Sequence, residues 1–176
     1  MSPGVVARLR DLAPIRALSR TEALRIAELQ ATRFLELVGV TSGPVPEKVI
    51  AELPRVQVER MSPFPVSGAT HWSNGRWLVI LNRAEPITRQ RFSLAHELKH
   101  ILDHRFVADL YQGVNAADRQ AWIEQVCDYF AGCLLMPRPW IKRAYTQGIQ
   151  RLPDLAAAFG VSQIAIQVRL NPGLLT

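Results

Sequence analysis

The sequence predicts a single domain with an α+β fold, and three observations support this prediction. Segments with apolar residues at helical spacing stand before residue 52 and after residue 88. Between them, residues 56–82 alternate apolar and polar side chains and contain an Asn-Gly turn signal. A chain of 176 residues, 48% of them hydrophobic and 20% charged, can bury one substantial core. We therefore expect a small antiparallel sheet of about three strands packed on a bundle of helices.

The N-terminal part of the chain is rich in arginine and has no continuous apolar segment. We expect residues 1–20 to form a basic N-terminal arm or helix ahead of the main domain, which takes in residues 21–176. No signal-peptide pattern is recognisable, and no apolar run approaches the roughly 20 residues needed to cross a bilayer. The sequence thus predicts a cytoplasmic protein without a membrane partner.

A helix opens the main domain. Residues 21–40 carry apolar residues at helical spacing, with Thr21 as the expected N-cap and Gly39 as the C-terminal stop. A turn follows, and then a short helix over residues 47–52, which Pro54 ends.

The strands come next. Residues 56–61 alternate apolar and polar side chains, as a half-buried strand does. Residues 68–72 and 76–82 flank Asn74 and Gly75, a strong signal for a β-hairpin turn. The edge strand of this hairpin could bind an extended peptide by β-addition.

Four further helices are expected, over residues 89–104, 118–135, 153–159 and 162–170, the last two forming a C-terminal helix pair (153–170) within the same domain. The first of them separates into two faces on a helical wheel. Its buried stripe consists of Leu94, Leu98, Ile101 and Leu102. The opposite face holds His96, His100, Asp103 and His104, with Glu97 at the border.

The first of these helices contains His-Glu-x-x-His. On a helix, residues four apart project from the same face, so His96 and His100 could grip one metal ion while Glu97 lies beside it. A catalytic zinc needs three protein ligands and one open position for water. A third ligand must therefore come from elsewhere in the chain.

Two carboxylates on the second long helix are candidates for completing this site. Glu124 and Asp128 lie four residues apart in an otherwise apolar stretch, where burial without a cation or donor would be costly. A zinc ion would satisfy Glu124, and the N–H of a ligand imidazole would satisfy Asp128. A helix-surface or capping role for Asp128 is the alternative.

Additional side chains are considered for contacts with the substrate or the transition state. They are His104, Tyr129, Tyr111 and His71. His104 lies about 12 Å along the helix from His96, too far to share the ion. His71 stands in a hairpin strand, where an ordinary strand role is the simpler interpretation.

The remaining features allow a competing interpretation. The formal net charge of +6 comes from arginine, and residues 155–165 resemble a helix-turn-helix. Its second helix offers few groove-reading side chains, so direct nucleic-acid binding is not expected.

Cys127 and Cys133 are interpreted as reduced, partly buried helix residues, not as a disulfide or a zinc site.

Three stretches together resemble the ImmA/IrrE family of zinc-dependent metallopeptidases. They are Gln-Arg-Phe-Ser-Leu-Ala-His-Glu-Leu-Lys-His at 90–100, Glu-x-x-Cys-Asp-x-Phe-Ala-x-x-Leu-Leu-Met-Pro at 124–137, and Phe-Gly-Val-Ser at 159–162 with Arg-Leu at 169–170. The resemblance covers residues from about 35 to 175. It implies a zincin-like, gluzincin-type fold and a Zn²⁺ cofactor. It also implies His96, His100 and Glu124 as ligands and Glu97 as general base.

The sequence departs from the family pattern in two places. Lys99 stands where Gly is usual, and Cys127-Asp128 stands where Ala-Asn is common. Neither change removes a ligand, but a lysine beside the site could alter substrate contacts or the charge of the cleft.

The resemblance implies a function in cleaving protein regulators. Several family members cleave helix-turn-helix repressors of phages, mobile elements or stress responses. We therefore expect a zinc endopeptidase whose partner is a transcriptional repressor. The alternative is a DNA-binding or protein-binding regulator with a structural or vestigial metal site.

Overall fold

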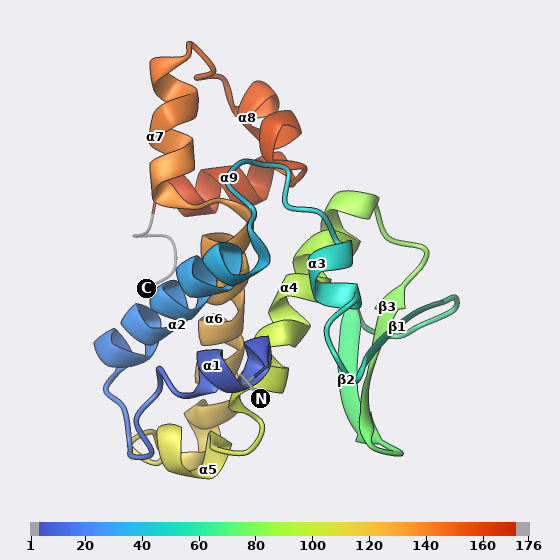
Figure 1. The fold of residues 1–176 in the computed structure, drawn as a ribbon, viewed down its shortest axis with the longest axis vertical. Coiled ribbons are helices and arrows are strands. Elements are labelled where there is room, and N and C mark those ends of the chain that lie inside the picture. Colours follow the sequence, from blue (N-terminus) through green and yellow to red (C-terminus); the bar gives the residue numbers. More distant parts are fainter. Residues whose placement is uncertain (1–3, 172–176) are drawn as a thin grey trace.

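The computed structural model describes residues 4–171 and shows a small sheet on one side of a helical bundle (Figure 1). The elements in chain order are α1 (Val5–Arg10), α2 (Arg20–Val38), α3 (Lys48–Ala51), β1 (Val56–Met61), β2 (Gly68–Ser73), β3 (Arg76–Asn82), α4 (Ile87–Asp103), α5 (Val107–Leu110), α6 (Ala116–Leu135), α7 (Arg138–Thr146), α8 (Leu152–Phe159) and α9 (Gln163–Leu170). The α+β prediction is confirmed. Within residues 4–171, no helix is both long and apolar enough to span a membrane.

The sheet has three strands, as predicted, in the order β1-β3-β2. The expectation of an entirely antiparallel sheet is wrong, because β1 runs parallel to β3 and only β2 is antiparallel to it. The hairpin turn at Asn74 and Gly75, both with positive φ, fixes only the β2–β3 pairing. Residues 62–67 carry the chain past the end of β3, so that β1 and β2 lie on opposite sides of it.

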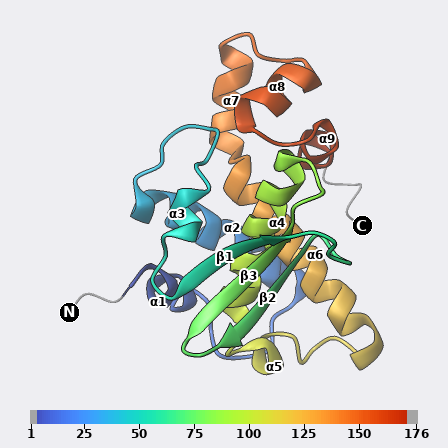
Figure 2. The ribbon, with the colours of Figure 1, turned by 90° about the vertical axis from the view of Figure 1, so that its right-hand side faces the viewer.

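Helix α4 lies between the sheet and the rest of the bundle (Figure 2). It packs against β2 and β3 on one side and against α6 on the other, and α6 in turn packs against α2. The predicted buried stripe of α4 is confirmed, since Leu94, Leu98, Ile101 and Leu102 are at most 1% exposed. Asp103 lies on the side of α4 opposite this stripe, as predicted, but it is not a surface residue, because its carboxylate is 2% exposed and pairs with the buried Lys99.

The ends of α2 show which capping signals operate. Ser19, not the predicted Thr21, is the N-cap: its side chain accepts from the N–H of Glu22, whose carboxylate accepts from the N–H of Ser19. Gly39 ends the helix in the left-handed conformation (φ 70°), as expected.

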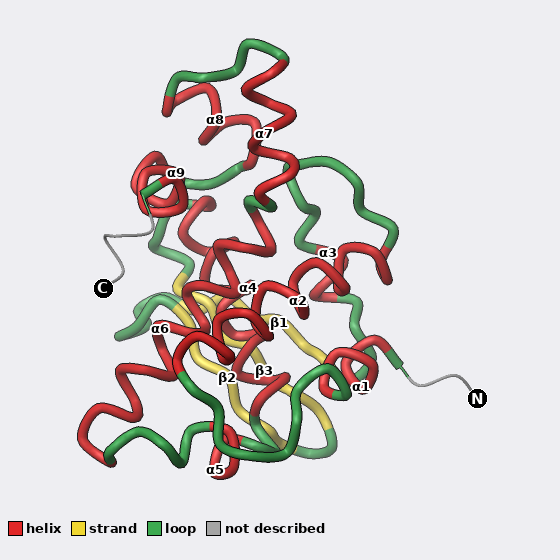
Figure 3. The backbone as a smooth tube through the Cα atoms, turned by 90° about the vertical axis from the view of Figure 1, so that its left-hand side faces the viewer, coloured by secondary structure: helices red, strands yellow, loops and turns green. Residues whose placement is uncertain are grey.

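The N-terminal segment is packed against the bundle. Helix α1 buries Leu9 completely, and the Arg10 guanidinium donates to the carbonyl oxygens of Ile101 (2.6 Å) and Leu102 (3.0 Å) near the end of α4. A cation there complements the negative end of the helix dipole. Helix α1 packs against α2 at the edge of the bundle (Figure 3), and its residues line a hollow together with Trp72 and Trp77 of the sheet.

Two helices, α5 and α7, were not predicted from the sequence. Helix α5 is a single turn, and α7 begins directly after Pro137, with Pro139 in its first turn. These prolines end α6, as expected, but a proline is also favourable in the first turn of a new helix. The C-terminal pair α8–α9 forms as predicted, with Gly160 in the left-handed conformation between the two helices.

Candidate metal centre

Helices α4 and α6 bring three metal-ligating side chains to one point. The Nε2 atom of His96 lies 3.1 Å from Nε2 of His100 and 3.1 Å from Oε2 of Glu124. Nε2 of His100 lies 3.5 Å from Oε1 of Glu124. The two imidazoles come from successive turns of α4, and the carboxylate comes from the facing side of α6.

These three separations fit a tetrahedral ion. Zinc–nitrogen and zinc–oxygen bonds of roughly 2.0–2.2 Å place neighbouring ligands about 3.3–3.5 Å apart at the corners of a tetrahedron. In the absence of an ion, two imidazole nitrogens and a carboxylate facing one another need protons between them. The donor set therefore suits a divalent cation such as zinc.

Asp128 and Gln120 hold two of these side chains in place from behind. Oδ1 of Asp128 lies 2.8 Å from Nδ1 of His96, so the Nδ1–H donates to the carboxylate and Nε2 remains free for an ion. The Gln120 amide donates to Oε1 of Glu124 at 2.6 Å. Both supporting residues lie on α6, four residues from Glu124 on either side.

The electrostatics of the cluster favour its charged forms. Burial opposes protonation of His96, but its hydrogen bonds with Asp128 and Glu124 outweigh burial and raise the pKa of His96 to about 9. Hydrogen bonds with His100 and His96 lower the pKa of Glu124 well below its usual range. Without a metal, Nε2 of His96 retains a proton, and a cation bound by the cluster would replace that proton.

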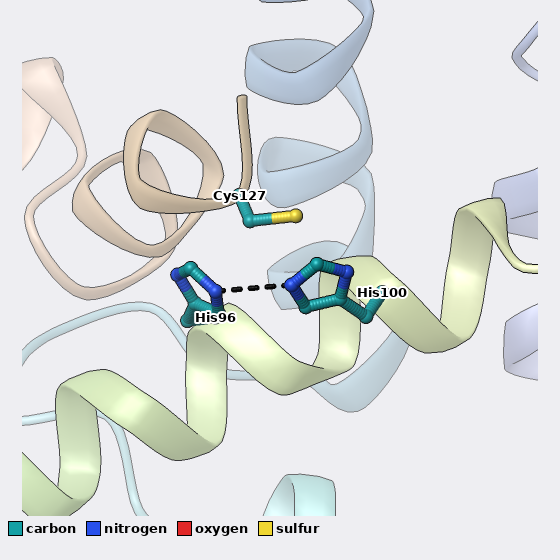
Figure 4. Close-up of side chains that lie close together, drawn as sticks. All are labelled: His96, His100 and Cys127. Atoms are coloured by element: carbon teal, nitrogen blue, oxygen red, sulfur yellow. Dashed lines mark hydrogen bonds between the residues drawn. The ribbon is translucent and has the colours of Figure 1, made fainter. Parts of the chain in front are cut away.

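Cys127 is a possible fourth member of the cluster. Its sulfur and the imidazole nitrogens of His96 and His100 lie within 4.8 Å of one another, and Figure 4 shows the sulfur directed toward the imidazoles. The side chain is fully buried. This burial is the main reason, and the nearby Asp103 carboxylate the second, why the pKa of the thiol is raised well above its usual value. The Glu124 carboxylate approaches the two imidazole nitrogens more closely, at 3.1 and 3.5 Å, and is therefore our candidate for the third ligand.

Glu97 lies beside this cluster at the foot of strand β2. It is 6% exposed and lines a cleft together with His96, His100 and Glu124. Gly68 permits this close approach, because a Cβ atom on Gly68 would lie 3.1 Å from Oε1 of Glu97. We call this space, bounded by Gly68, Glu97 and Glu124, the metal-site cleft.

The metal-site cleft has two arms. One arm runs along β2 past Thr70 to Trp77 and His104, whose rings meet edge to face with centroids 4.7 Å apart. The other arm runs past Ser67 toward the start of α4 at Arg89. His104 is therefore the sequence candidate that lies in the same cleft as Glu97 and His100.

The other candidates lie elsewhere. Lys99 is 2% exposed, and its Nζ donates to Asp103 (2.6 Å) and Gln30 (2.8 Å), so the expectation that it contacts substrate or charges the cleft is wrong. The Tyr111 hydroxyl is also directed away from the cleft, since it donates to Asp103 at 2.6 Å.

Tyr129 and His71 differ in position. Tyr129 is half-buried, and its hydroxyl donates to Glu28 at 3.1 Å. His71 is exposed on β2, one residue beyond the part of the strand that lines the cleft.

Sequence reasoning missed Gly68 and Gln120. The spacing of Gln120 and Glu124, four residues apart on one helix, is a recognisable signal for a supporting amide. Nothing in the local sequence around Gly68 reveals its contact, because Glu97 is distant in the chain.

Crossed helices that gather two imidazoles and a carboxylate beside a small sheet form a site of the kind found in metallopeptidases. Residues 54–171 match the family model described as the IrrE N-terminal-like domain, which is a peptidase family. This match takes in more than half of the chain, and the chain belongs to that family.

Two known proteins are similar to this chain. The Radiation response metalloprotease IrrE of Deinococcus radiodurans is 31% identical over 78 residues, which cover 40% of this chain and only 24% of that protein. A solved structure described as a Mycobacterium tuberculosis transcriptional regulator has a TM-score of 0.69 at 18% identity, over 96% of this chain and 52% of that one. At that identity the likeness shows a shared fold alone.

Proposed function

We propose that this chain is a zinc-dependent endopeptidase that cleaves a protein regulator of transcription. The convergence of His96, His100 and Glu124 within 3.1–3.5 Å supports the proposal most directly. In this assignment these three side chains hold zinc, Asp128 orients His96, and Glu97 is the general base. Family membership supports a peptidase, and the metalloprotease relative supports a metal-dependent one.

Zinc held by these ligands would supply a Lewis acid that polarises the scissile carbonyl and lowers the pKa of water to about 7. Glu97, buried in the cleft floor, takes the proton of the attacking water and delivers it to the leaving nitrogen. The His104 ring, in the same cleft, is placed to donate a hydrogen bond to the substrate.

The substrate peptide would lie along strand β2. In the sheet order β1-β3-β2, this strand pairs on one side only, and its first residues line the cleft. An extended peptide can add to such an edge through main-chain hydrogen bonds, with its scissile bond near Glu97.

The protein regulator that we propose as substrate is a helix-turn-helix repressor of a phage, a mobile element or a stress response. The resemblance to the ImmA/IrrE family supports this choice, and the name of the Deinococcus relative refers to a radiation response. Such a substrate implies that cleavage takes place in the cytoplasm.

The test is cleavage of the repressors encoded beside the gene by the zinc-loaded chain, followed on gels and by mass spectrometry. Glu97→Gln is the matched control, because it keeps the ligands and removes the base. We expect this variant to bind one zinc per chain and to lose about 10²–10⁴-fold in rate. Equal cleavage by both proteins would remove Glu97 from the mechanism, and no cleavage by either would contradict the proposed substrate.

The alternative of a DNA-binding regulator depends on the helix pair α8–α9. The exposed side chains of α9 include Gln163, Ile164 and Gln167, whereas Arg169 donates to the carbonyl oxygen of Met136 at 3.0 Å. This helix therefore presents no exposed cation to phosphates, and Gln163 and Gln167 are the side chains that it offers to base edges. A steep salt-dependent affinity for duplex DNA would favour the alternative.

A further inference from the structure

A second groove, with mostly apolar walls, opens between the start of α4, the end of α6 and helix α9. Its floor and walls include Phe92, Gly132, Met136, Ile164, Ala165 and Val168. We call it the apolar groove. Neither the metal ligands nor the general base lie in it, and the proposed chemistry leaves it without a role.

The apolar groove is continuous with the metal-site cleft. Arg89, Phe92 and Asp128 line both spaces. Oδ1 of Asp128 lies 2.8 Å from Nδ1 of His96. The Asp128 side chain therefore separates the groove from the candidate metal centre. A peptide advancing about 3.3 Å per residue through the cleft would reach it within roughly two or three residues of the scissile bond.

The size of the groove suits a single side chain. Its volume is about 250 Å³, below the roughly 300–1,000 Å³ of pockets that enclose whole small molecules. Gly132 keeps the floor open, since a Cβ atom there would meet only Arg169 Cδ at 3.9 Å and Met136 Cε at 4.0 Å.

Helix α9 contributes an apolar wall with no partner of its own in residues 4–171. Ile164 is 72% exposed, so most of its apolar surface is available at the rim of the groove. Ala165 and Val168 continue the same face into the groove. These residues belong to the helix-turn-helix-like pair that the proposed chemistry does not use.

We propose that the apolar groove is the specificity pocket for one large apolar side chain of the substrate (Leu, Ile, Met or Phe) close to the scissile bond. In this assignment the α8–α9 pair selects the peptide instead of reading DNA. The inference rests on the proposed function, because it places a peptide in the metal-site cleft.

The first test uses zinc-loaded chain and a peptide library prepared from a digested bacterial proteome, with cleavage sites identified by mass spectrometry. We expect one position near the cleaved bond to prefer large apolar residues. Gly132→Leu fills the groove, and we expect it to shift that position toward Ala, Ser or Gly by about 10–100-fold in relative rate. An unchanged preference in a folded Gly132→Leu protein would overturn the proposal.

A second variant covers the case in which Gly132→Leu does not fold. Ile164→Ser removes part of the wall at an exposed site, and Ile15→Ser is its matched control, since both isoleucines are 72% exposed. We expect Ile164→Ser to weaken the preference about fivefold and Ile15→Ser to leave it unchanged. Equal effects of the two substitutions would contradict a role for the groove.

A binding measurement separates this proposal from the proposed function. Blocked dipeptide amides of leucine and of alanine are titrated into the zinc-loaded Glu97→Gln chain while the methyl NMR signals of Ile164 and Val168 are followed. Leucine-specific shifts support the groove even if the wild-type chain cleaves nothing. Cleavage without a positional preference and without methyl shifts would reject the groove and leave the peptidase assignment intact.

Discussion

His96 is held from both sides, and this arrangement decides how the cluster presents itself to an ion. Its Nδ1–H is committed to Asp128 at 2.8 Å, so its Nε2 faces His100 and Glu124. In the ion-free chain these hydrogen bonds raise the pKa of His96 to about 9 against the opposing effect of burial. A metal cation must displace the proton on Nε2 of His96. The Asp128 carboxylate stabilises positive charge on the imidazole, and it therefore favours binding of the proton and of the metal ion alike.

We predict that Asp128→Ala lowers zinc affinity about 10–100-fold, because the imidazole of His96 loses the acceptor that fixes its orientation. Competition with a chromophoric zinc chelator measures the change. Gln125→Ala, an exposed site on the same helix, is the control. Affinity equal to wild type in Asp128→Ala would show that the carboxylate is only a surface group.

Cys127 bears on whether a bound ion would have four protein ligands, or three with one position open for water. Two imidazoles, Glu124 and a thiolate would complete a four-coordinate structural zinc site, whereas three ligands leave a position for water. We predict that Cys127→Ala keeps zinc affinity within about threefold, whereas Glu124→Ala loses 100-fold or more, because the Glu124 carboxylate lies closer to the imidazole nitrogens, at 3.1 and 3.5 Å. Zinc lost with Cys127 and retained without Glu124 would point to a structural site.

At the level of elements, the polar side chains of α4 divide between the cleft and the interior, although they lie along one side of the helix. His96, Glu97 and His100 line the cleft, while Lys99 and Asp103 are buried. Periodicity predicted the first group and the apolar stripe from local sequence. It could not predict that Lys99 is buried, because its partners Gln30 and Asp103 and their neighbour Tyr111 come from α2, α4 and the segment after α5.

The Lys99–Asp103 pair gives a stability prediction. Lys99→Met leaves a buried carboxylate without its cation, and we expect a loss of about 3–5 kcal/mol in the free energy of unfolding. Adding Asp103→Asn removes that charge, keeps an acceptor for Tyr111 and should recover most of the loss. Urea unfolding with excess chelator measures both. A double variant as unstable as the single one would contradict the charge-pair explanation.

The pairing of strands shows a similar limit of local sequence. Asn74-Gly75 predicted the β2–β3 hairpin correctly, because a two-residue turn fixes its own strands. The parallel β1–β3 pairing depends on how residues 62–67 cross the sheet, and nothing in the alternation of residues 56–61 encodes direction. It is this crossing that leaves β2 at the edge beside the cleft.

For the molecule as a whole, the layers explain where the cleft lies. The sheet covers α4 on one side, α6 covers it on the other with α2 packed on α6, and the C-terminal helices stand beyond the start of α4 (Figure 1). The cleft therefore has an edge strand along one wall and α9 near one end. The N-terminal segment, expected as a basic arm or helix, contains helix α1 and contacts the C-terminal end of α4 through Arg10.

Because the proposed ligands come from α4 and α6, which form the centre of the bundle, a bound ion should stabilise the entire fold. An ion that binds only the folded chain adds about 2.7 kcal/mol at 100 times its dissociation constant. For a chain of this length we predict a rise in Tm of about 5–10 °C with zinc, reversed by a chelator and measured by differential scanning calorimetry. His96→Ala combined with His100→Ala is the control, because it removes both imidazoles and should show no shift. A rise of equal size in that variant would mean that zinc acts elsewhere on the molecule, and no rise in wild type would contradict a metal centre at the crossing of α4 and α6.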